Sequence, residues 1–151
     1  MEYRIVRLGD YPHQPIKNFA EARNFYLNDG WILFVDNDEQ ASEMLLDYLD
    51  KLVPKYAYYW VRVINLCQGR FIPWMNPHLD SRLMSSQVKY SGRQAPRGYV
   101  MEGRVSPYKP HGIIDYPIIH NHPRDDWHTN ISTIKKIWLR SKKMTDTMRG
   151  R

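Results

Sequence analysis

The stretch at residues 31–39 reads Trp-Ile-Leu-Phe-Val-Asp-Asn-Asp-Glu, and the rest of the chain is best interpreted outward from it. Five large apolar residues predict a buried strand, and three carboxylates follow within four residues. Acids clustered at the end of a buried strand repel one another and resist removal from water. They therefore favour a bound divalent cation, since Mg²⁺ and Mn²⁺ prefer carboxylate oxygens. The alternative is an acid-rich first helical turn that complements the helix dipole, and the residues alone leave both interpretations open.

The sequence around this stretch predicts alternating strands and helices. Residues 3–8 are typical of a short strand, and Asn18 is expected to cap a helix that ends at Gly30. A second amphipathic helix is expected from about 39 to 51. This order predicts an α/β fold, in which ligands collect at the carboxyl ends of strands, where the acids of residues 36–39 would lie.

The second half of the chain predicts more strands and one irregular segment. Strands are expected at residues 57–66, 70–74, 82–84, 88–90 and 116–120, the first two forming a hairpin across Gln68-Gly69. Residues 92–110 are rich in Gly and Pro and lack periodicity, which predicts a loop-like segment of functional interest. A final helix is expected from about 129 to 142, and neither an internal repeat nor a second domain is evident.

The composition is typical of one soluble globular domain. The chain has 151 residues, of which 42% are hydrophobic and 25% charged. It lacks an apolar run of membrane-spanning length and a signal-peptide pattern. Its single cysteine, Cys67, cannot form an internal disulfide and is expected to be buried. These features predict a cytoplasmic location.

The net charge of +6 is concentrated at the C-terminal end. Residues 134–151 contain seven Lys or Arg and one acid, whereas the remaining residues carry equal numbers of acids and bases. Such a tail could attract an anionic surface and place the protein at the periphery of a membrane, or it could be a solvated terminus. The neutral body and the lack of an RNP-like motif give no reason to expect a specific nucleic acid partner.

Histidines close a second apolar run. His120-Asn121-His122 follows Ile118-Ile119, so an imidazole could complete a metal site begun by Asp36 and Asp38. The alternative is a histidine bonded to backbone at a strand end. A structural zinc site, a calcium-binding EF-hand and a phosphate-binding glycine loop all lack their required spacing.

Together these segments resemble the family 2 glycosyltransferases with the GT-A fold. Residues 18–24 and 30–39 are similar to the family's Ala-Arg-Asn helix, Trp-Ile-Leu strand and Asp-x-Asp-Glu metal motif. Residues 76–84 and 90–92 resemble its Arg-Leu-Phe strand and aromatic-x-Gly turn, and residues 118–120 resemble a late strand ending in His. The resemblance runs from about Asn18 to Arg140.

The resemblance implies a fold and an activity. The fold would be a single GT-A-like (nucleotide-diphospho-sugar transferase) α/β domain over residues 1–140, a mixed sheet flanked by helices, followed by the basic tail at 141–151. The activity would be a metal-dependent, hexosyltransferase-like transfer of a sugar from a nucleotide-sugar donor to an acceptor hydroxyl, with inversion. The acceptor would be a glycan, a lipid or a protein, and the cofactor Mn²⁺ or Mg²⁺.

The resemblance also assigns roles to residues. The metal would be held by Asp36, Asp38 and His120, and the donor would be bound by Arg23, Asn24 and Asp36. An inverting displacement needs a general base to deprotonate the acceptor, for which Asp80 and Glu102 are the candidates and Asp115 is a poorer one.

The chain departs from the family pattern in two places, of which the first favours an alternative and the second leaves the general base unassigned. The short segment before Asn18 does not contain the strand–helix units that usually bind the nucleotide base, and Gln94-Ala95-Pro96 stand where the family often has a His-Glu pair. The alternative is a non-catalytic module that binds a glycan or partner on a degenerate glycosyltransferase fold. The intact cluster of three acids disfavours it.

Overall fold

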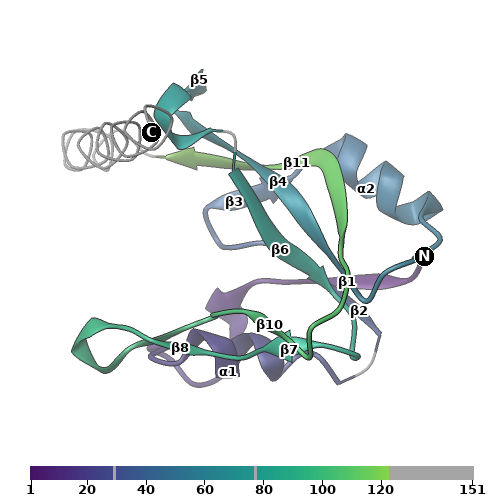
Figure 1. Cartoon of the computed structure of the whole chain (residues 1–151). Coiled ribbons are helices and arrows are strands. Elements are labelled where there is room, and N and C mark those ends of the chain that lie inside the picture. Colours follow the sequence, from purple (N-terminus) through teal and green to yellow (C-terminus); the bar gives the residue numbers. More distant parts are fainter. Residues whose placement is uncertain (29, 77, 123–151) are drawn as a thin grey trace, which may run out of the picture.

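Among the described residues, seven strands form one mixed sheet that curls along its length (Figure 1). The strand order is β1-β2-β6-β4-β11-β3, with β5 paired to β4. The pairs β1–β2 and β4–β11 are parallel, and the other pairs of this sheet are antiparallel. This computed structural model describes residues 1–28, 30–76 and 78–122. The predicted α/β class is confirmed as a mixed sheet with few helices.

The element bounds are β1 (Tyr3–Val6), α1 (Phe19–Asn24), β2 (Trp31–Phe34), β3 (Glu39–Ala41), α2 (Glu43–Lys51), β4 (Tyr58–Cys67), β5 (Arg70–Phe71), β6 (His78–Met84), β7 (Lys89–Tyr90), β8 (Arg93–Gln94), β9 (Val100–Met101), β10 (Val105–Ser106) and β11 (Gly112–His122). Single turns of 3₁₀ helix lie at Leu8–Asp10, Pro73–Met75 and Pro96–Gly98.

The predicted buried strand is confirmed as β2, which is covered on both faces. Ile32 and Phe34 pack into one core with residues of α1 and β7, whereas Leu33 and Val35 pack into a second core with α2. All four side chains are fully buried. A strand covered on both faces is expected to be apolar throughout rather than alternating, which explains the unbroken run at residues 31–35.

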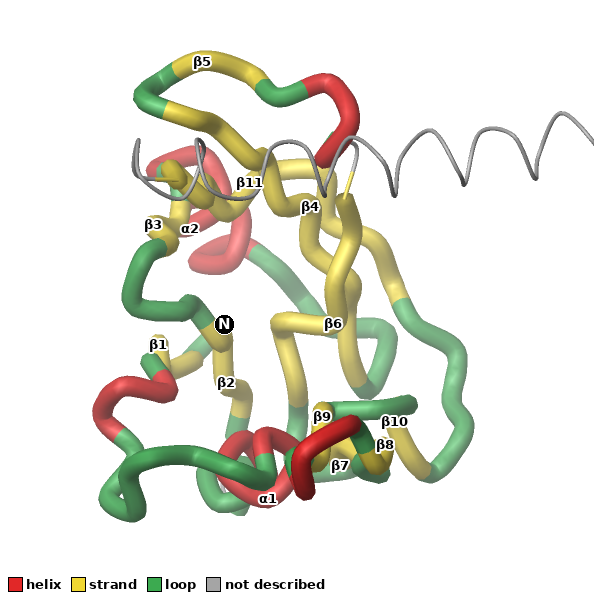
Figure 2. Tube along the Cα trace, turned by 90° about the vertical axis from the view of Figure 1, so that its left-hand side faces the viewer, coloured by secondary structure: helices red, strands yellow, loops and turns green. Residues whose placement is uncertain are grey.

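The two layers that cover the sheet lie on opposite sides of it. α1 and the short strands β7 to β10 form one layer, and α2 lies on the other side of the sheet (Figure 1, Figure 2). The predicted cap of α1 is confirmed, because the side chain of Asn18 accepts a hydrogen bond from Glu21 N at 2.9 Å. α1 ends at Asn24 rather than at the predicted Gly30, and turns follow it over residues 25–28.

The predicted helix over residues 39–51 is wrong in its first turn. Residues 39–41 form β3, which pairs antiparallel with β11, and α2 begins only at Glu43. Two contacts explain the difference. Glu39 turns its carboxylate to Arg82 and to the backbone of Asp36, and Ser42 supplies the actual cap by accepting a hydrogen bond from Leu45 N at 3.2 Å.

The last strand, β11, is longer than predicted and sharply bent (Figure 1). Its pairing with β4 shifts between Ile114 and Ile118, and Pro117 lies in the shifted segment, where a residue without an N–H is tolerated. Beyond the bend, His120 lies opposite Glu39 of β3. The bend therefore brings the late histidine to the acids that follow β2.

The segment at residues 92–110 is irregular but anchored. Its short strands form two-stranded ladders, β8 with β9 and β10 with β7. Val100 N donates to Lys17 O at 2.8 Å, and Gly92 N donates to Glu102 O at 2.8 Å. The predicted loop-like character is thus only partly correct, because backbone bonds fix much of the segment against α1.

Other predictions have mixed outcomes. The β4–β5 hairpin and the burial of Cys67 are confirmed. The expected helix at 129–142 and the basic tail at 141–151 lie outside the described residues. Within residues 1–28, 30–76 and 78–122, no helix is long and apolar enough to cross a membrane.

Candidate functional site

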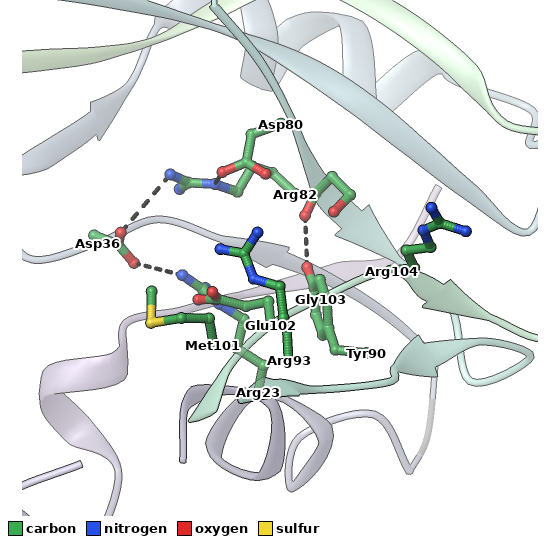
Figure 3. Close-up of a pocket in the computed structure, with 11 residues that line it drawn as sticks. Arg23, Asp36, Asp80, Arg82, Tyr90, Arg93, Met101, Glu102, Gly103 and Arg104 are labelled. Atoms are coloured by element: carbon green, nitrogen blue, oxygen red, sulfur yellow. Dashed lines mark hydrogen bonds and ion pairs between the residues drawn. The ribbon is translucent and has the colours of Figure 1, made fainter. Parts of the chain in front are cut away.

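A pocket of about 560 Å³ opens beyond the end of β2, between the sheet and the α1 layer (Figure 3). Seven of its lining residues are charged: Arg23, Asp36, Asp80, Arg82, Arg93, Glu102 and Arg104. Four of the site residues expected from the sequence, Arg23, Asp36, Asp80 and Glu102, therefore meet at one place although they come from distant segments. The strand-end position expected for Asp36 is confirmed.

Arg82 enters the pocket through a β-bulge. Tyr59 and Trp60 of β4 are consecutive, but they pair with Leu83 and Ser81 of β6, so Arg82 is the extra residue. A bulge bends its strand and re-aims the extra side chain, and such bulges are enriched beside active sites. The bulge thus turns a charged side chain of an otherwise apolar strand end toward the acids that follow β2.

Arg82 and Glu39 form a buried, two-pronged ion pair. Arg82 Nη1 donates to Glu39 Oε1 at 2.6 Å and Nη2 donates to Oε2 at 3.0 Å, with 6% and 3% of the two side chains exposed. Burial alone would raise the pKa of Glu39, but the hydrogen bond and charge of Arg82 outweigh it and hold the pKa below its usual value. Glu39 therefore serves as the anchor of Arg82.

Arg82 also donates to Phe34 O of β2 at 3.2 Å, and two further contacts reach into the pocket. Its Nε donates to Asp80 Oδ2 at 2.9 Å, and its Nη2 lies 3.7 Å from Asp36 Oδ2. Burial alone would lower the pKa of Arg82, but the bond to Glu39 and the neighbouring carboxylates raise it, so the guanidinium stays charged. Arg82 thereby fixes two pocket carboxylates at once.

Arg23 faces Arg82 from α1 across the carboxylate of Asp36 (Figure 3). Its Nη2 lies 3.2 Å from Asp36 Oδ1, and its Nε donates to Glu102 Oε1 at 3.0 Å. Arg23 Nη1 is buried without a hydrogen-bond partner, and it is the one buried side-chain polar atom in that condition among residues 1–28, 30–76 and 78–122. The same guanidinium lies over the ring of Phe34, with its central carbon 5.1 Å from the ring centroid, so a cation–π contact accompanies the missing hydrogen bond.

Asp38 and His120 meet beside the pocket rather than in its lining. His120 Nε2 lies 2.7 Å from Asp38 Oδ2, and 58% of the Asp38 side chain is exposed. Asp36, the third residue expected to hold the metal, points to Arg23 and Arg82 instead. In the described part of the chain no three His, Cys, Asp or Glu side chains converge as a preformed metal site. The structure thus brings together two of the three expected ligands.

Asn24, expected to bind the donor, has both ends of its amide bonded to the backbone of Tyr90. Asn24 Nδ2 donates to Tyr90 O at 2.8 Å, and Tyr90 N donates to Asn24 Oδ1 at 2.8 Å. The amide therefore forms the two backbone hydrogen bonds that a neighbouring strand would form, and it holds β7 against α1. Tyr90 in turn closes the pocket floor, where its hydroxyl donates to Ser81 O at 2.5 Å.

Replacing Asn24 with alanine is expected to lower the free energy of unfolding by about 1–3 kcal/mol, because two partly buried backbone groups of Tyr90 lose their partners. Urea titration measures the change. Asn28→Ala is the matched control, since its exposed bond to Phe25 O should matter by no more than about 0.5 kcal/mol. Equal losses in the two variants would contradict the role given to Asn24.

Two glycines, Gly92 and Gly103, allow the two segments that contain them to cross at close contact beside the pocket. A Cβ on Gly103 would lie 2.8 Å from the backbone of Gly92, and the two residues have φ of +69° and +83°. Only glycine combines this conformation with this approach. The crossing sets the positions of Arg93, Glu102 and Arg104, which flank the two glycines.

Gly103→Ala is therefore expected to destabilise the protein more than Gly98→Ala. Both positions have a positive φ, so both variants carry backbone strain of roughly 1–2 kcal/mol. A Cβ on Gly98 meets nothing within 4 Å, so only Gly103→Ala adds a backbone clash. Thermal unfolding of the two variants separates the effects, and equal melting temperatures would show that the crossing can open without cost.

The sequence did not reveal several residues of this site. Arg82, Arg93, Arg104 and Tyr90 line the pocket, and Glu39 anchors Arg82, without having been given these roles. Glu39, Arg82 and Tyr90 lay within segments that resembled the family, whereas Arg93 and Arg104 gave no signal. Asp115, the poorer candidate base, lies outside the pocket lining and pairs with Arg62, with 76% of its side chain exposed.

Comparison with known proteins adds no assignment. The sequence matches no model of a protein family and no curated protein.

Proposed function

We propose that this chain is a metal-dependent glycosyltransferase with a GT-A-like core, which moves a sugar from a nucleotide-sugar donor to an acceptor hydroxyl with inversion. The observation that carries the proposal is the meeting of Asp36, Arg23, Asp80 and Glu102 in one pocket at the end of a buried strand. The resemblance to family 2 glycosyltransferases supports the same assignment. The reaction needs a bound cation, a grip on phosphate and a base, and the pocket has residue types suited to each.

The acids around the end of β2 fit a divalent cation. Four carboxylates, those of Asp36, Glu39, Asp80 and Glu102, lie around the guanidinium groups of Arg23 and Arg82, and Arg7 bonds to the backbone carbonyls of Asp36 and Glu39. Asp38 and His120 already lie within hydrogen-bond distance and offer oxygen and nitrogen ligands. Mg²⁺ is commonly held by one or two carboxylates together with substrate phosphates, so a complete protein cage is not required.

In the proposed reaction, Asp36, Asp38 and His120 would hold Mn²⁺ or Mg²⁺. When bound, the cation neutralises charge that develops on the leaving diphosphate. Arg23, which lines the pocket, would contact the donor phosphates. Asn24 would act indirectly, by holding β7 and Tyr90 in place.

Asp80 and Glu102 are the candidate general bases, and they approach the pocket from opposite walls (Figure 3). Each accepts a bond from an arginine through one oxygen, which holds the carboxylate in a fixed orientation. The other oxygen of each has no hydrogen bond within the described residues and could accept the proton of the acceptor hydroxyl.

The alternative is a non-catalytic binding module on a degenerate glycosyltransferase fold. One observation favours it: the carboxylate of Asp36 is already engaged by Arg23 and Arg82, which compete with a metal for its oxygens. Such a module would bind a glycan or partner without releasing nucleotide. Binding and turnover therefore have to be measured separately.

Isothermal titration of UDP, GDP and their sugars, with and without Mn²⁺, tests the proposal. The expected result is binding of one nucleotide that requires the cation. Binding unaffected by Mn²⁺, or absent for both nucleotides, would count against a metal-dependent transferase. Cation-dependent binding without turnover would favour the alternative.

A further inference from the structure

The charges lining the pocket are divided between two regions. Around Asp36, the guanidinium groups of Arg23 and Arg82 are matched by carboxylates, and that of Arg7 bonds to the backbone carbonyl of Asp36. On the outer wall, Arg93 and Arg104 line the same pocket, and neither forms an ion pair with an acid of residues 1–28, 30–76 and 78–122. The pocket therefore has an acidic region suited to a cation and a basic wall suited to an anion.

The basic wall is held in place by the backbone. Ser91 N donates to Arg104 O at 2.7 Å, and Arg104 N donates to Ser91 Oγ at 3.1 Å. The contact of Gly92 with Gly103 locks the two segments at the next residue of each. The guanidinium of Arg93 points into the pocket, and Arg104 lies on the side away from Asp36 (Figure 3). Both arginines thus extend from fixed backbone.

The unmatched charge of this wall points to an anion. Arg93 and Arg104 are exposed at the pocket, whereas Nε and Nη2 of Arg23 are already bonded to carboxylates. Planar guanidinium groups match phosphate geometry closely, so two unmatched ones on one wall of a cavity fit a phosphate better than a neutral sugar.

We propose that Arg93 and Arg104 form a phosphate-binding wall that acts without the metal. Phosphate binding by this wall does not depend on the proposed transferase activity. Only the identity of the substrate that carries the phosphate rests on that proposed function. Two sources share this chemistry. One is the diphosphate of the donor, and the other is a phosphate on the acceptor, which would make the acceptor an anionic molecule.

Titration in EDTA tests the wall directly, with inorganic pyrophosphate as the probe. The full chain is expected to bind pyrophosphate, and the R93Q/R104Q variant should bind about tenfold more weakly or worse, since charge-assisted hydrogen bonds are lost. Arg70→Gln is the control, because Arg70 is exposed on β5, lies outside the pocket and changes the net charge in the same direction. Circular dichroism melts confirm that each variant is folded.

Two further titrations distinguish the sources. One uses UDP or GDP in Mn²⁺, and the other uses glycerol 3-phosphate as the probe for a phosphate on the acceptor. If the donor brings the phosphate, R93Q/R104Q weakens the binding of UDP or GDP, and the nucleotide displaces glycerol 3-phosphate. If the acceptor brings the phosphate, glycerol 3-phosphate binds alongside the nucleotide, and R93Q/R104Q weakens the binding of glycerol 3-phosphate alone.

Two results would overturn the wall: no pyrophosphate binding by the wild type in EDTA, or an equal loss in Arg70→Gln. Either result would leave cation-dependent nucleotide binding and turnover untouched, so the two proposals fail separately. Conversely, a chain that shows no turnover could still bind pyrophosphate through Arg93 and Arg104.

Discussion

Replacing Glu39 with alanine is expected to lower the free energy of unfolding by about 3–5 kcal/mol, because it leaves the buried guanidinium of Arg82 without its main partner. The control is Asp115→Ala, which breaks the exposed ion pair with Arg62 and should cost no more than about 1 kcal/mol. Urea unfolding at pH 7 measures both. Similar losses in the two variants would contradict the anchoring role of Glu39.

Removing both partners sharpens this prediction. Glu39→Ala combined with Arg82→Met leaves no buried charge, so the double variant should be more stable than Glu39→Ala alone. The carboxylates of Asp36 and Asp80 should nevertheless lose their fixed positions in the double variant, since Arg82 contacts both. A double variant less stable than the single one would show that Arg82 stabilises the fold independently of Glu39.

The pH dependence of this effect has a definite sign. Because the pKa of Glu39 is lowered on folding, its contribution is complete above its unfolded pKa of about 4.3 and is lost as the pH falls through the folded value. The stability gap between wild type and Glu39→Ala should therefore shrink in acid. A gap that widens below pH 4 would contradict the assigned direction.

Replacing Asp38 with alanine is expected to weaken Mn²⁺-dependent nucleotide binding by more than about 100-fold while leaving the fold intact. Loss of groups that merely support metal ligands costs about 10–100-fold, so loss of a ligand should cost more. The side chain is largely exposed and its pairing with His120 is worth little in stability. Asp47→Ala, which removes an exposed acid of α2, is the control for charge. Equal nucleotide affinity in wild type and Asp38→Ala would exclude a metal site at Asp38.

The front half of the fold was predictable because its signals are local. The apolar run at 31–35, the cap at Asn18 and the hairpin across Gln68-Gly69 each follow from a few neighbouring residues. The strand-end position of Asp36 followed from the same run. The convergence of Arg23, Asp80 and Glu102 on that strand end was expected only through the resemblance to a known family.

What the sequence could not show depends on long-range pairing. The first turn of the predicted helix became β3 because Glu39 pairs with Arg82, 43 residues away, and local patterning carries no trace of that bond. The bulge that re-aims Arg82 comes from a register shift between β4 and β6, which depends on how two strands fit together. The crossing of Gly92 and Gly103 is likewise a contact between segments, so the basic wall with Arg93 and Arg104 was not predicted.

Release of nucleoside diphosphate from a panel of UDP- and GDP-sugars tests the central claim most directly. Water can replace the acceptor hydroxyl, so slow release needs no knowledge of the acceptor. We expect the wild type to release UDP or GDP from at least one donor in Mn²⁺, and we expect release to stop in EDTA and in Asp38→Ala. Release that continues unchanged in EDTA, or no release from any donor with Mn²⁺ present, would contradict a metal-dependent glycosyltransferase.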